Sequence, residues 1–398
     1  MKKNQYSFLW RENYIDYLWA TNVSAKVYFR HSGLFVYDGC QLSAFGSNEE
    51  LLFSRRESER IFEIDKYQNI FKSLLEIENK ARNLSRIFSE INLKKIDDRA
   101  IYDNYLKLFS LMRIFVSVYR FTEPQYVSWA EKSIRAYLSK IEPSKEKQEY
   151  LLADLLSKKI DANRIFNKDV VKKAKFLKEI SLKRFRAKKI DILISDMAES
   201  LLRETAKRSF LAVSQVSSLN LLELRRVLLK KLPLNLKRVN KRKKFFYLKI
   251  TNLDEKSSIK TFLREDEKLF KKIGNPNRKN FLITGSTGYP GVIEGEAYLV
   301  PALSTTEEYR KVCAVFPAGK ILVAPMTSPN LVPILSKAIA FVTDEGGITS
   351  HAALIAREMR KPCVVGTIYG SQIIKNGMKI KVDASNGRVI ILTSDNKK

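Results

Sequence analysis

One stretch of the sequence places a histidine among residues that favour anions. Residues 344–358 read DEGGITSHAALIARE, so His351 follows two glycines and two hydroxyl residues and precedes a run of strong helix formers. This spacing predicts a histidine at the start of a helix. Unpaired backbone N–H groups and a partial positive charge at that end would favour a phosphoryl group.

Four residues just before the histidine could support this chemistry. Gly346 and Gly347 would allow a tight turn and the close approach of a bulky anion, and are candidate phosphate-binding residues. Thr349 and Ser350 could cap the helix or donate to a phosphate oxygen. The same residues also fit an ordinary helix start that has a histidine beside it. Local chemistry alone favours that simpler interpretation.

Motifs on both sides of the histidine follow the pattern of a known family. Upstream, GSTGYPGVIEGEAYLV reads as an opening glycine-rich strand, and MTSPNLVPILSKAIAFVTDEGG holds a Thr-x-Pro segment, a short helix and a strand. Downstream, KPCVVG corresponds to a Pro-Val-Val-Gly strand and KNGMKIKVDASNGRVIIL to a closing hairpin with an Asp-x-x-x-Gly turn. In this order, the motifs resemble the mobile, or swivelling, phosphohistidine domain of the phosphoenolpyruvate-utilising enzymes, such as phosphoenolpyruvate synthase and pyruvate phosphate dikinase.

The resemblance implies roles for these residues. His351 would be the catalytic nucleophile that carries the phosphoryl group, Thr349 and Ser350 would support it, and Gly346 and Gly347 would lie at the phosphate. The domain would swing between a donor site and an acceptor site. Such a chain would be a dikinase-like phosphotransferase component, incomplete alone.

Two positions after the histidine need separate comment. Arg357 lies six residues past His351, where helical geometry does not place it beside the imidazole, and we expect a surface ion pair. The family commonly shows Leu-Gly after this helix, whereas Met359 and Arg360 stand here. Loss of a C-cap glycine should cost the helix end on the order of 1 kcal/mol.

Glycine and proline divide the chain sharply. Four glycines and four prolines lie in the first 280 residues, against eleven and seven in the last 118. The front is therefore predicted to be mostly helical, with helices that include residues 67–91, 101–119, 169–180 and 190–208, and the back to be turn-rich α/β. LFVYDGCQLSAF, with its Asp38-Gly39 turn, is the best hairpin signal in the front.

These signals define the predicted organisation. The fold class is multidomain α plus α/β: a mostly helical N-terminal region with a short β-hairpin, followed by a compact β/β/α swivelling phosphohistidine domain. The predicted parts are residues 1–60 with the hairpin, a helical domain at 61–274, a linker at 275–281 and the phosphohistidine domain at 282–393.

The front portion lacks the signals of a nucleotide site. Neither GxxxxGK[ST] nor a GxGxxG after a strand occurs, and four scattered glycines do not supply a phosphate-wrapping loop. We therefore expect no cofactor on this chain alone. The resemblance to the phosphoenolpyruvate-utilising enzymes implies ATP with Mg²⁺ at a separate partner of the ATP-grasp type. The acceptor would be a small molecule, pyruvate-like or other. Two histidines and three unpaired cysteines fit no metal site.

The formal charge of +29 belongs mostly to the front, where 59 Lys and Arg face 34 Asp and Glu. The densest basic stretch, residues 231–250, reads KLPLNLKRVNKRKKFFYLKI. We favour a solvated helix surface over nucleic-acid binding, because no nucleic-acid-binding motif accompanies the charge. Docking to an acidic protein stays open. The leading hypothesis is a phosphotransfer component, and the alternative is a non-catalytic interaction protein that uses both domains for docking.

No apolar run is long enough to cross a membrane, and MKKNQYSFLWRE does not fit a signal peptide. We therefore expect a cytoplasmic protein without membrane contact.

Overall fold

The computed structural model describes most of the chain, as two compact units. The described residues are 6–12, 32–37, 42–47, 56–57, 60, 67–157, 162–244, 246–251, 258–262, 282–301, 303 and 306–392. Unit 1 comprises Met1–Phe121 and Lys189–Asn275, and unit 2 comprises Thr122–Lys188 and Pro276–Lys398. The boundary between the two units falls inside the helical domain predicted at 61–274. The predicted domain limits stay a prediction. The predicted linker at 275–281 lies outside the described residues.

Unit 1 is mostly helical. Its helices are α4 (Tyr67–Glu90), α5 (Asp98–Tyr119), the second half of α9 (Lys168–Ser209), α10 (Val213–Val216), α11 (Leu221–Leu229) and α12 (Leu236–Lys244). The sequence predicted two helices at 169–180 and 190–208, whereas α9 is one helix of 42 residues. The SLKRFRAKK stretch between them contains neither glycine nor proline. Nothing there interrupts the backbone, although its polar composition hides the apolar periodicity.

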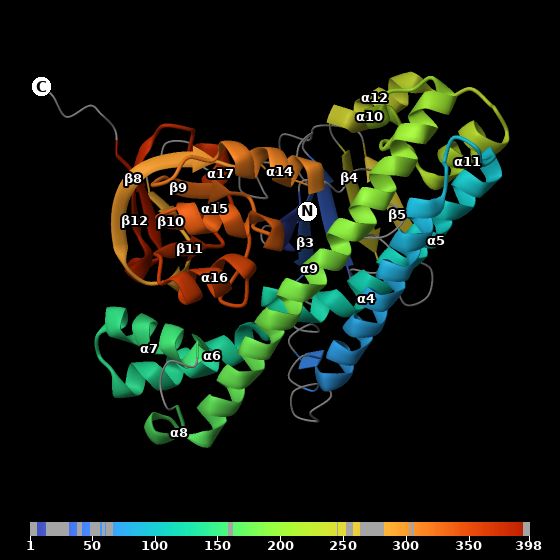
Figure 1. The fold of residues 1–398 in the computed structure, drawn as a ribbon. Coiled ribbons are helices and arrows are strands. Elements are labelled where there is room, and N and C mark those ends of the chain that lie inside the picture. Colours follow the sequence, from blue (N-terminus) through green and yellow to red (C-terminus); the bar gives the residue numbers. More distant parts are fainter. Residues whose placement is uncertain are drawn as a thin grey trace, which may run out of the picture. The chain divides into compact units, whose positions relative to one another are not determined.

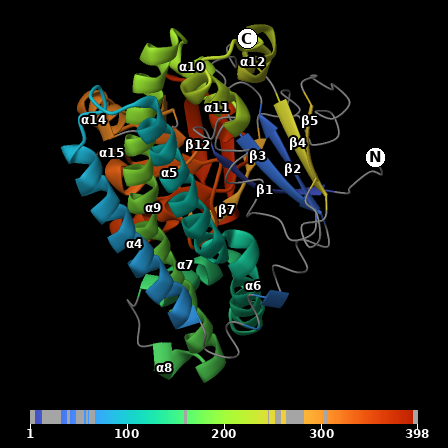
Figure 2. The same ribbon diagram turned by 90° about the vertical axis from the view of Figure 1, so that its right-hand side faces the viewer.

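A five-stranded sheet completes unit 1. It appears as one layer in Figure 2. Its strands are β1 (Tyr6–Glu12), β2 (Ser32–Tyr37), β3 (Leu42–Ser47), β4 (Phe246–Thr251) and β5 (Ser258–Phe262), antiparallel in the order β1-β3-β2-β4-β5. β2 and β3 are the arms of the predicted hairpin, whose Asp38-Gly39 turn lies outside the described residues. The hairpin is thus part of a larger sheet. Strands from distant sequence join it, and pairing of that kind leaves no local signal.

Several helices of unit 2 precede the strands of its sheet in the sequence. After the short turn η2 (Arg120–Thr122) come α6 (Pro124–Ile141), α7 (Lys145–Ser157), α8 (Ala162–Ile165) and the first half of α9. The later helical elements are α14 (Thr306–Val315), η3 (Pro329–Leu331), α15 (Val332–Lys337), α16 (His351–Met359), α17 (Gly370–Ile373) and η4 (Ala384–Asn386). α7 packs against α16 and against a strand of the sheet, β7 (Ser286–Tyr289).

The sheet of unit 2 has eight strands in the order β6-β13-β12-β8-β9-β10-β11-β7. Besides β7 they are β6 (Leu282–Thr284), β8 (Val292–Leu299), β9 (Ile321–Ala324), β10 (Ala340–Thr343), β11 (Cys363–Val365), β12 (Lys379–Asp383) and β13 (Arg388–Ile391). The neighbours β8, β9, β10 and β11 are parallel, and the flanking pairs are antiparallel. The helices α14 to α17 lie beside this sheet (Figure 1).

The parallel strands form the core of unit 2. Every residue of β9, β10 and β11 is buried. Their apolar side chains, among them Val323, Val342 and Val364, join one cluster with residues of the antiparallel strands. Strands covered on both faces read as continuous apolar runs, as ILVA, AFVT and CVV do. The chain therefore combines a helical N-terminal region with a mixed-sheet C-terminal region, as the α plus α/β class predicted. None of the described helices is both long and apolar enough to span a bilayer.

The C-terminal end of α16 lacks the expected C-cap glycine, and its backbone is strained. Arg360, the C-cap residue, is exposed and has a left-handed backbone with φ of +54°. A side chain in this region clashes with its own backbone, which is why glycine is common at this position. The expected strain at the helix end is therefore present.

We predict that Arg360→Gly raises the free energy of unfolding by roughly 0.5–1 kcal/mol, because it relieves left-handed strain at an exposed position. Arg360→Ala removes the same charge and side chain but keeps a Cβ, so it should give no comparable gain. Urea unfolding of both variants measures the difference. An alanine variant as stable as the glycine variant would contradict the strain explanation.

Candidate functional site

Three loops meet at one edge of the unit 2 sheet. Thr327 follows β9, residues 344–351 follow β10, and residues 366–371 follow β11. Because β9, β10 and β11 are parallel, their carboxyl ends share this edge. Ligands of open α/β sheets bind at the carboxyl ends of parallel strands. The predicted site residues thus lie where this architecture favours a site.

His351 is the first residue of α16. Ser350 is the N-cap, and its Oγ accepts a hydrogen bond from Ala353 N at 3.3 Å. The imidazole Nδ1 lies 2.8 Å from Thr327 Oγ1. Nε2 is buried and has no hydrogen-bond partner among the residues that the structure describes. One ring nitrogen is therefore held by a hydroxyl and the other is unengaged, and the helix start lies where the sequence predicted it.

The imidazole is also covered on its face. Phe185 of α9 stacks on the ring, with 5.1 Å between ring centroids and 19° between planes. The relative solvent-accessible surface of His351 is 8%. Burial lowers its pKa from 6.5 to about 3, because the charged imidazolium is poorly solvated there. The ring is consequently neutral near pH 7.

The two glycines shape the turn that leads into α16. Gly346 has φ of +111°, and a Cβ there would come within 2.7 Å of Ser350 Cβ, so only glycine fits. The Gly347 carbonyl accepts a hydrogen bond from Ser350 N at 2.9 Å. Thr349 is buried within this turn. The turn therefore places the cap residue and His351, while phosphate binding by the glycines stays a prediction.

Asp344 ties two of the three loops together. Its buried carboxylate accepts hydrogen bonds from Thr367 Oγ1 at 3.0 Å, from Ser371 N at 2.8 Å and from the Ser371 hydroxyl. The backbone N–H of Ile368 also donates to the Asp344 carbonyl at 3.0 Å. A buried carboxylate needs such donors to offset its desolvation. Asp344 thus fixes the loop after β11 against the loop that carries His351.

Sequence reasoning did not place Thr327 or Asp344 in the site. Both lie within motifs that it used, since Thr327 opens the Thr-x-Pro segment and Asp344 precedes the Gly-Gly turn. The first polar residues after buried parallel strands were the available signal. Only the fold brings Thr327 to the histidine 24 residues later.

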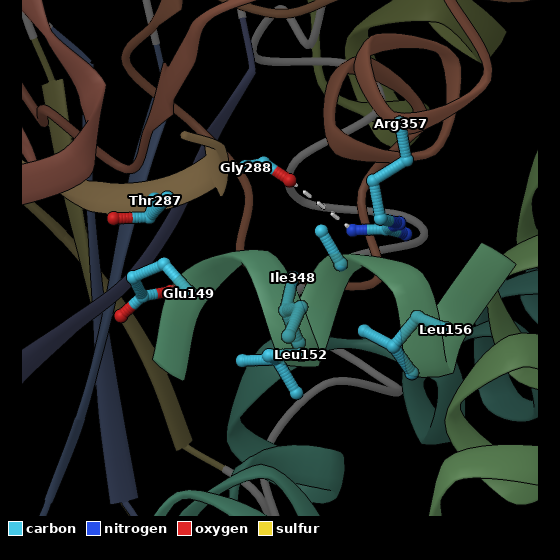
Figure 3. Close-up of a pocket in the computed structure, with 8 residues that line it drawn as sticks. Glu149, Leu152, Leu156, Thr287, Gly288, Ile348 and Arg357 are labelled. Carbon is cyan, nitrogen blue, oxygen red and sulfur yellow. Dashed lines mark hydrogen bonds between the residues drawn. The ribbon is translucent and has the colours of Figure 1, made fainter. Parts of the chain in front are cut away.

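The expectation for Arg357 was wrong. Its side chain is buried and its Nη1 lies 3.5 Å from the Gly288 carbonyl of β7. Figure 3 shows the guanidinium beside the face of α7 that presents Leu152 and Leu156. Burial lowers its pKa to about 10, partly offset by Cys363 and Glu131 nearby, so it stays cationic at neutral pH. Arg357 therefore anchors the far end of α16 inside unit 2.

The described ranges bring together no group of three His, Cys, Asp or Glu side chains that could hold a metal ion. Cys313 and Cys363 are free thiols, and burial raises the pKa of both. Neither Cys40 nor His31 lies within the described residues.

Known proteins resemble the part of the chain that carries this site. Residues 316–387 match the family model of the PEP-utilising enzyme, mobile domain. The probable phosphoenolpyruvate synthase of Staphylothermus marinus is 40% identical over 119 residues, which are 30% of this chain and 14% of that protein. The phosphoenolpyruvate synthase of Aeropyrum pernix is 43% identical over 108 residues, 27% of this chain and 12% of that protein. This chain thus spans a small fraction of the length of these relatives.

A solution structure of Enzyme I aligns with 68% of this chain and 81% of that chain, at 15% identity. Its TM-score of 0.20 is too low for the likeness to bear on the fold. The motifs around His351 and the family match agree, and residues 316–387 belong to the mobile-domain family of the phosphoenolpyruvate-utilising enzymes.

Proposed function

We propose that this chain takes part in phosphoryl transfer, with His351 as the transient carrier of the phosphoryl group. The supporting observation is the state of its imidazole, which is neutral, held at Nδ1 by Thr327 and unengaged at Nε2. A neutral imidazole with one nitrogen anchored is the form that acts as a nucleophile. The N-terminus of α16 would stabilise the negative charge that the phosphoryl group adds.

The proposed transfer proceeds in two steps. In the tautomer with its proton on Nδ1, that nitrogen donates to Thr327 Oγ1 and the Nε2 lone pair attacks phosphorus. A P–N bond forms while the P–O bond to the donor breaks, and the leaving oxygen keeps the electron pair. An oxygen of the acceptor then attacks the same phosphorus, and Nε2 recovers its lone pair. Thr327 Oγ1 would stabilise the positive charge on Nδ1–H in between.

We further propose ATP with Mg²⁺ as the donor system, bound by a partner of the ATP-grasp type. Support comes from the first 280 residues, in which no glycine-rich phosphate loop is recognisable. The two relatives are named phosphoenolpyruvate synthases, which favours a pyruvate-like acceptor. We also propose that this chain contributes to a dikinase-like transferase activity and that it is cytoplasmic.

Radiolabelling tests the carrier role. We expect the purified chain, incubated with a cell extract of its source and ATP labelled at the β and γ phosphorus, to acquire acid-labile, base-stable label on His351. His351→Ala should abolish this label, and His31→Ala, which removes the other histidine, should retain it. An unlabelled wild-type chain, or label that persists in His351→Ala, would contradict the proposal and favour the docking alternative.

The hydroxyl of Thr327 provides a second test. Thr327→Val keeps the shape and removes the hydrogen bond to Nδ1, so phosphorylation of His351 by phosphoramidate should slow by roughly tenfold or more. Thr287→Val is the matched control, because the Thr287 hydroxyl is also buried and donates to the Ala384 carbonyl at 2.7 Å. Equal rates for Thr327→Val and wild type would argue against Thr327 as a positioning residue.

The neutral state of His351 predicts a pH dependence of stability. Above the unfolded-state pKa of 6.5, the imidazole is neutral in both the folded and the unfolded protein. Its contribution to the free energy of unfolding is therefore fully present there. As pH falls from 6.5 toward 3, the unfolded ring binds a proton that the folded ring does not, and stability is lost. Between about pH 7 and about pH 4.5, the wild type should lose roughly 2–3 kcal/mol more than His351→Gln. Chemical unfolding at both pH values measures this, and equal losses would disprove it.

A further inference from the structure

The helices α11 and α12 of unit 1 carry a large excess of positive charge. Residues 221–244 contain ten Lys and Arg and a single acidic residue, Glu223. Together with α10, these helices lie near the C-terminal end of α9, as Figure 1 and Figure 2 both show. The charge is therefore gathered on one part of unit 1.

One arginine of α12 fixes this helix in place. The Arg242 side chain is buried, and its Nη1 and Nη2 donate to the two carboxylate oxygens of Glu223 on α11. Its Nη1 also donates to the Ser218 carbonyl at 2.9 Å. Repulsion between neighbouring cations disfavours an isolated helix as basic as α12. The buried pair holds α12 against α11 despite that repulsion, so the exposed cations of α12 are preorganised.

The acidic residues in contact with these helices are already engaged within unit 1. Glu223 is paired with Arg242. Asp98 is paired with Arg208 and Lys231. Six further cations are exposed, and none of them forms an ion pair with a carboxylate of the described residues: Arg225, Arg226, Lys230, Lys237, Lys241 and Lys244. We call these six residues the α11–α12 basic surface.

Leucines close to these cations in the sequence are exposed as well. Leu222 on α11, Leu232 between the helices and Leu236 at the start of α12 have relative solvent-accessible surfaces of 71%, 44% and 42%. Covering such side chains is favourable. The phosphate backbone of a nucleic acid supplies charge without apolar cover, whereas an acidic amphipathic helix supplies both carboxylates and apolar side chains. The combination of cations and leucines therefore favours a protein partner.

We propose that the α11–α12 basic surface, with its three exposed leucines, docks an acidic amphipathic segment of a protein partner. Lys237 and Lys241 are one helical turn apart on α12, so they present their charges on the same side to carboxylates of that segment. Complementary charge accelerates association, and apolar cover of the leucines prolongs it. The inference goes beyond the proposed carrier function, since this surface belongs to unit 1 and His351 belongs to unit 2.

Fluorescence anisotropy with a defined peptide tests the surface. The probe is a labelled helical peptide of about 20 residues with a glutamate face and a leucine face, and its neutral counterpart has glutamine for glutamate. In about 0.15 M salt, the full chain should bind the glutamate peptide roughly tenfold more tightly than the glutamine peptide. Lys237→Glu combined with Lys241→Glu should weaken binding of the glutamate peptide by roughly tenfold or more.

Lys72→Glu combined with Lys80→Glu is the matched control. Both lysines are exposed on α4 of the same unit, and the change in net charge is identical. This variant should bind the glutamate peptide within about threefold of wild type. Far-UV circular dichroism verifies that the variants are folded. Equal weakening by both pairs of substitutions would overturn the proposal, because it would indicate a general charge effect, and so would equal binding of the two peptides.

The leucines distinguish a protein partner from a nucleic acid. Leu232→Ser combined with Leu236→Ser keeps every charge, so it should weaken binding of the glutamate peptide by roughly fivefold or more and leave binding of a duplex DNA of about 20 base pairs within about twofold of wild type. Unchanged peptide binding would overturn the proposal, as would tighter binding of DNA or RNA than of the peptide at the same salt. These assays involve no phosphoryl transfer, so their outcome is independent of the carrier role of His351.

Discussion

The hydrogen bond between Thr327 Oγ1 and His351 Nδ1 joins the loops after β9 and β10, and the proposed chemistry depends on it. A histidine ring offers two nitrogens, and which one reacts is set by the partner of the other. Here the partner is a hydroxyl on a different strand end. The interaction therefore requires the parallel pairing of β9 with β10, which brings both loops to one edge. The pairing of these buried strands thus determines how the His351 imidazole is oriented.

Burial of His351 favours its neutral form and also restricts access to its Nε2. Desolvation keeps His351 neutral, which suits a nucleophile, and Asp344 holds the adjoining loop through three side-chain-mediated hydrogen bonds. The same burial leaves Nε2 without access. A carrier must accept its group from one site and release it at another, so a rigid closed site alone cannot serve.

The far end of α16 is fixed in a different way. Arg357 is buried against the Gly288 carbonyl, in a small cleft that α7 lines with Leu152, Ala153 and Leu156 (Figure 3). A buried guanidinium is costly unless it is paired and hydrogen-bonded, and Glu131 offsets part of that cost. α16 therefore has a polar, capped start that bears His351 and a cationic anchor toward its end. The preceding helices of unit 2 are part of the support of this helix rather than an independent module.

The sequence by itself determined the local features around His351. The Gly-Gly turn, the Ser350 cap and the helix start are encoded by neighbouring residues, and the missing glycine at Arg360 predicted the strained helix end. Tertiary structure alone decided which distant groups meet the ring. Thr327 and Phe185 reach His351 from other elements, and Arg357 is buried instead of paired at the surface. The physical reason is that capping and turn preferences act within a few residues, whereas contacts across strands and helices depend on pairing and packing that no local pattern records.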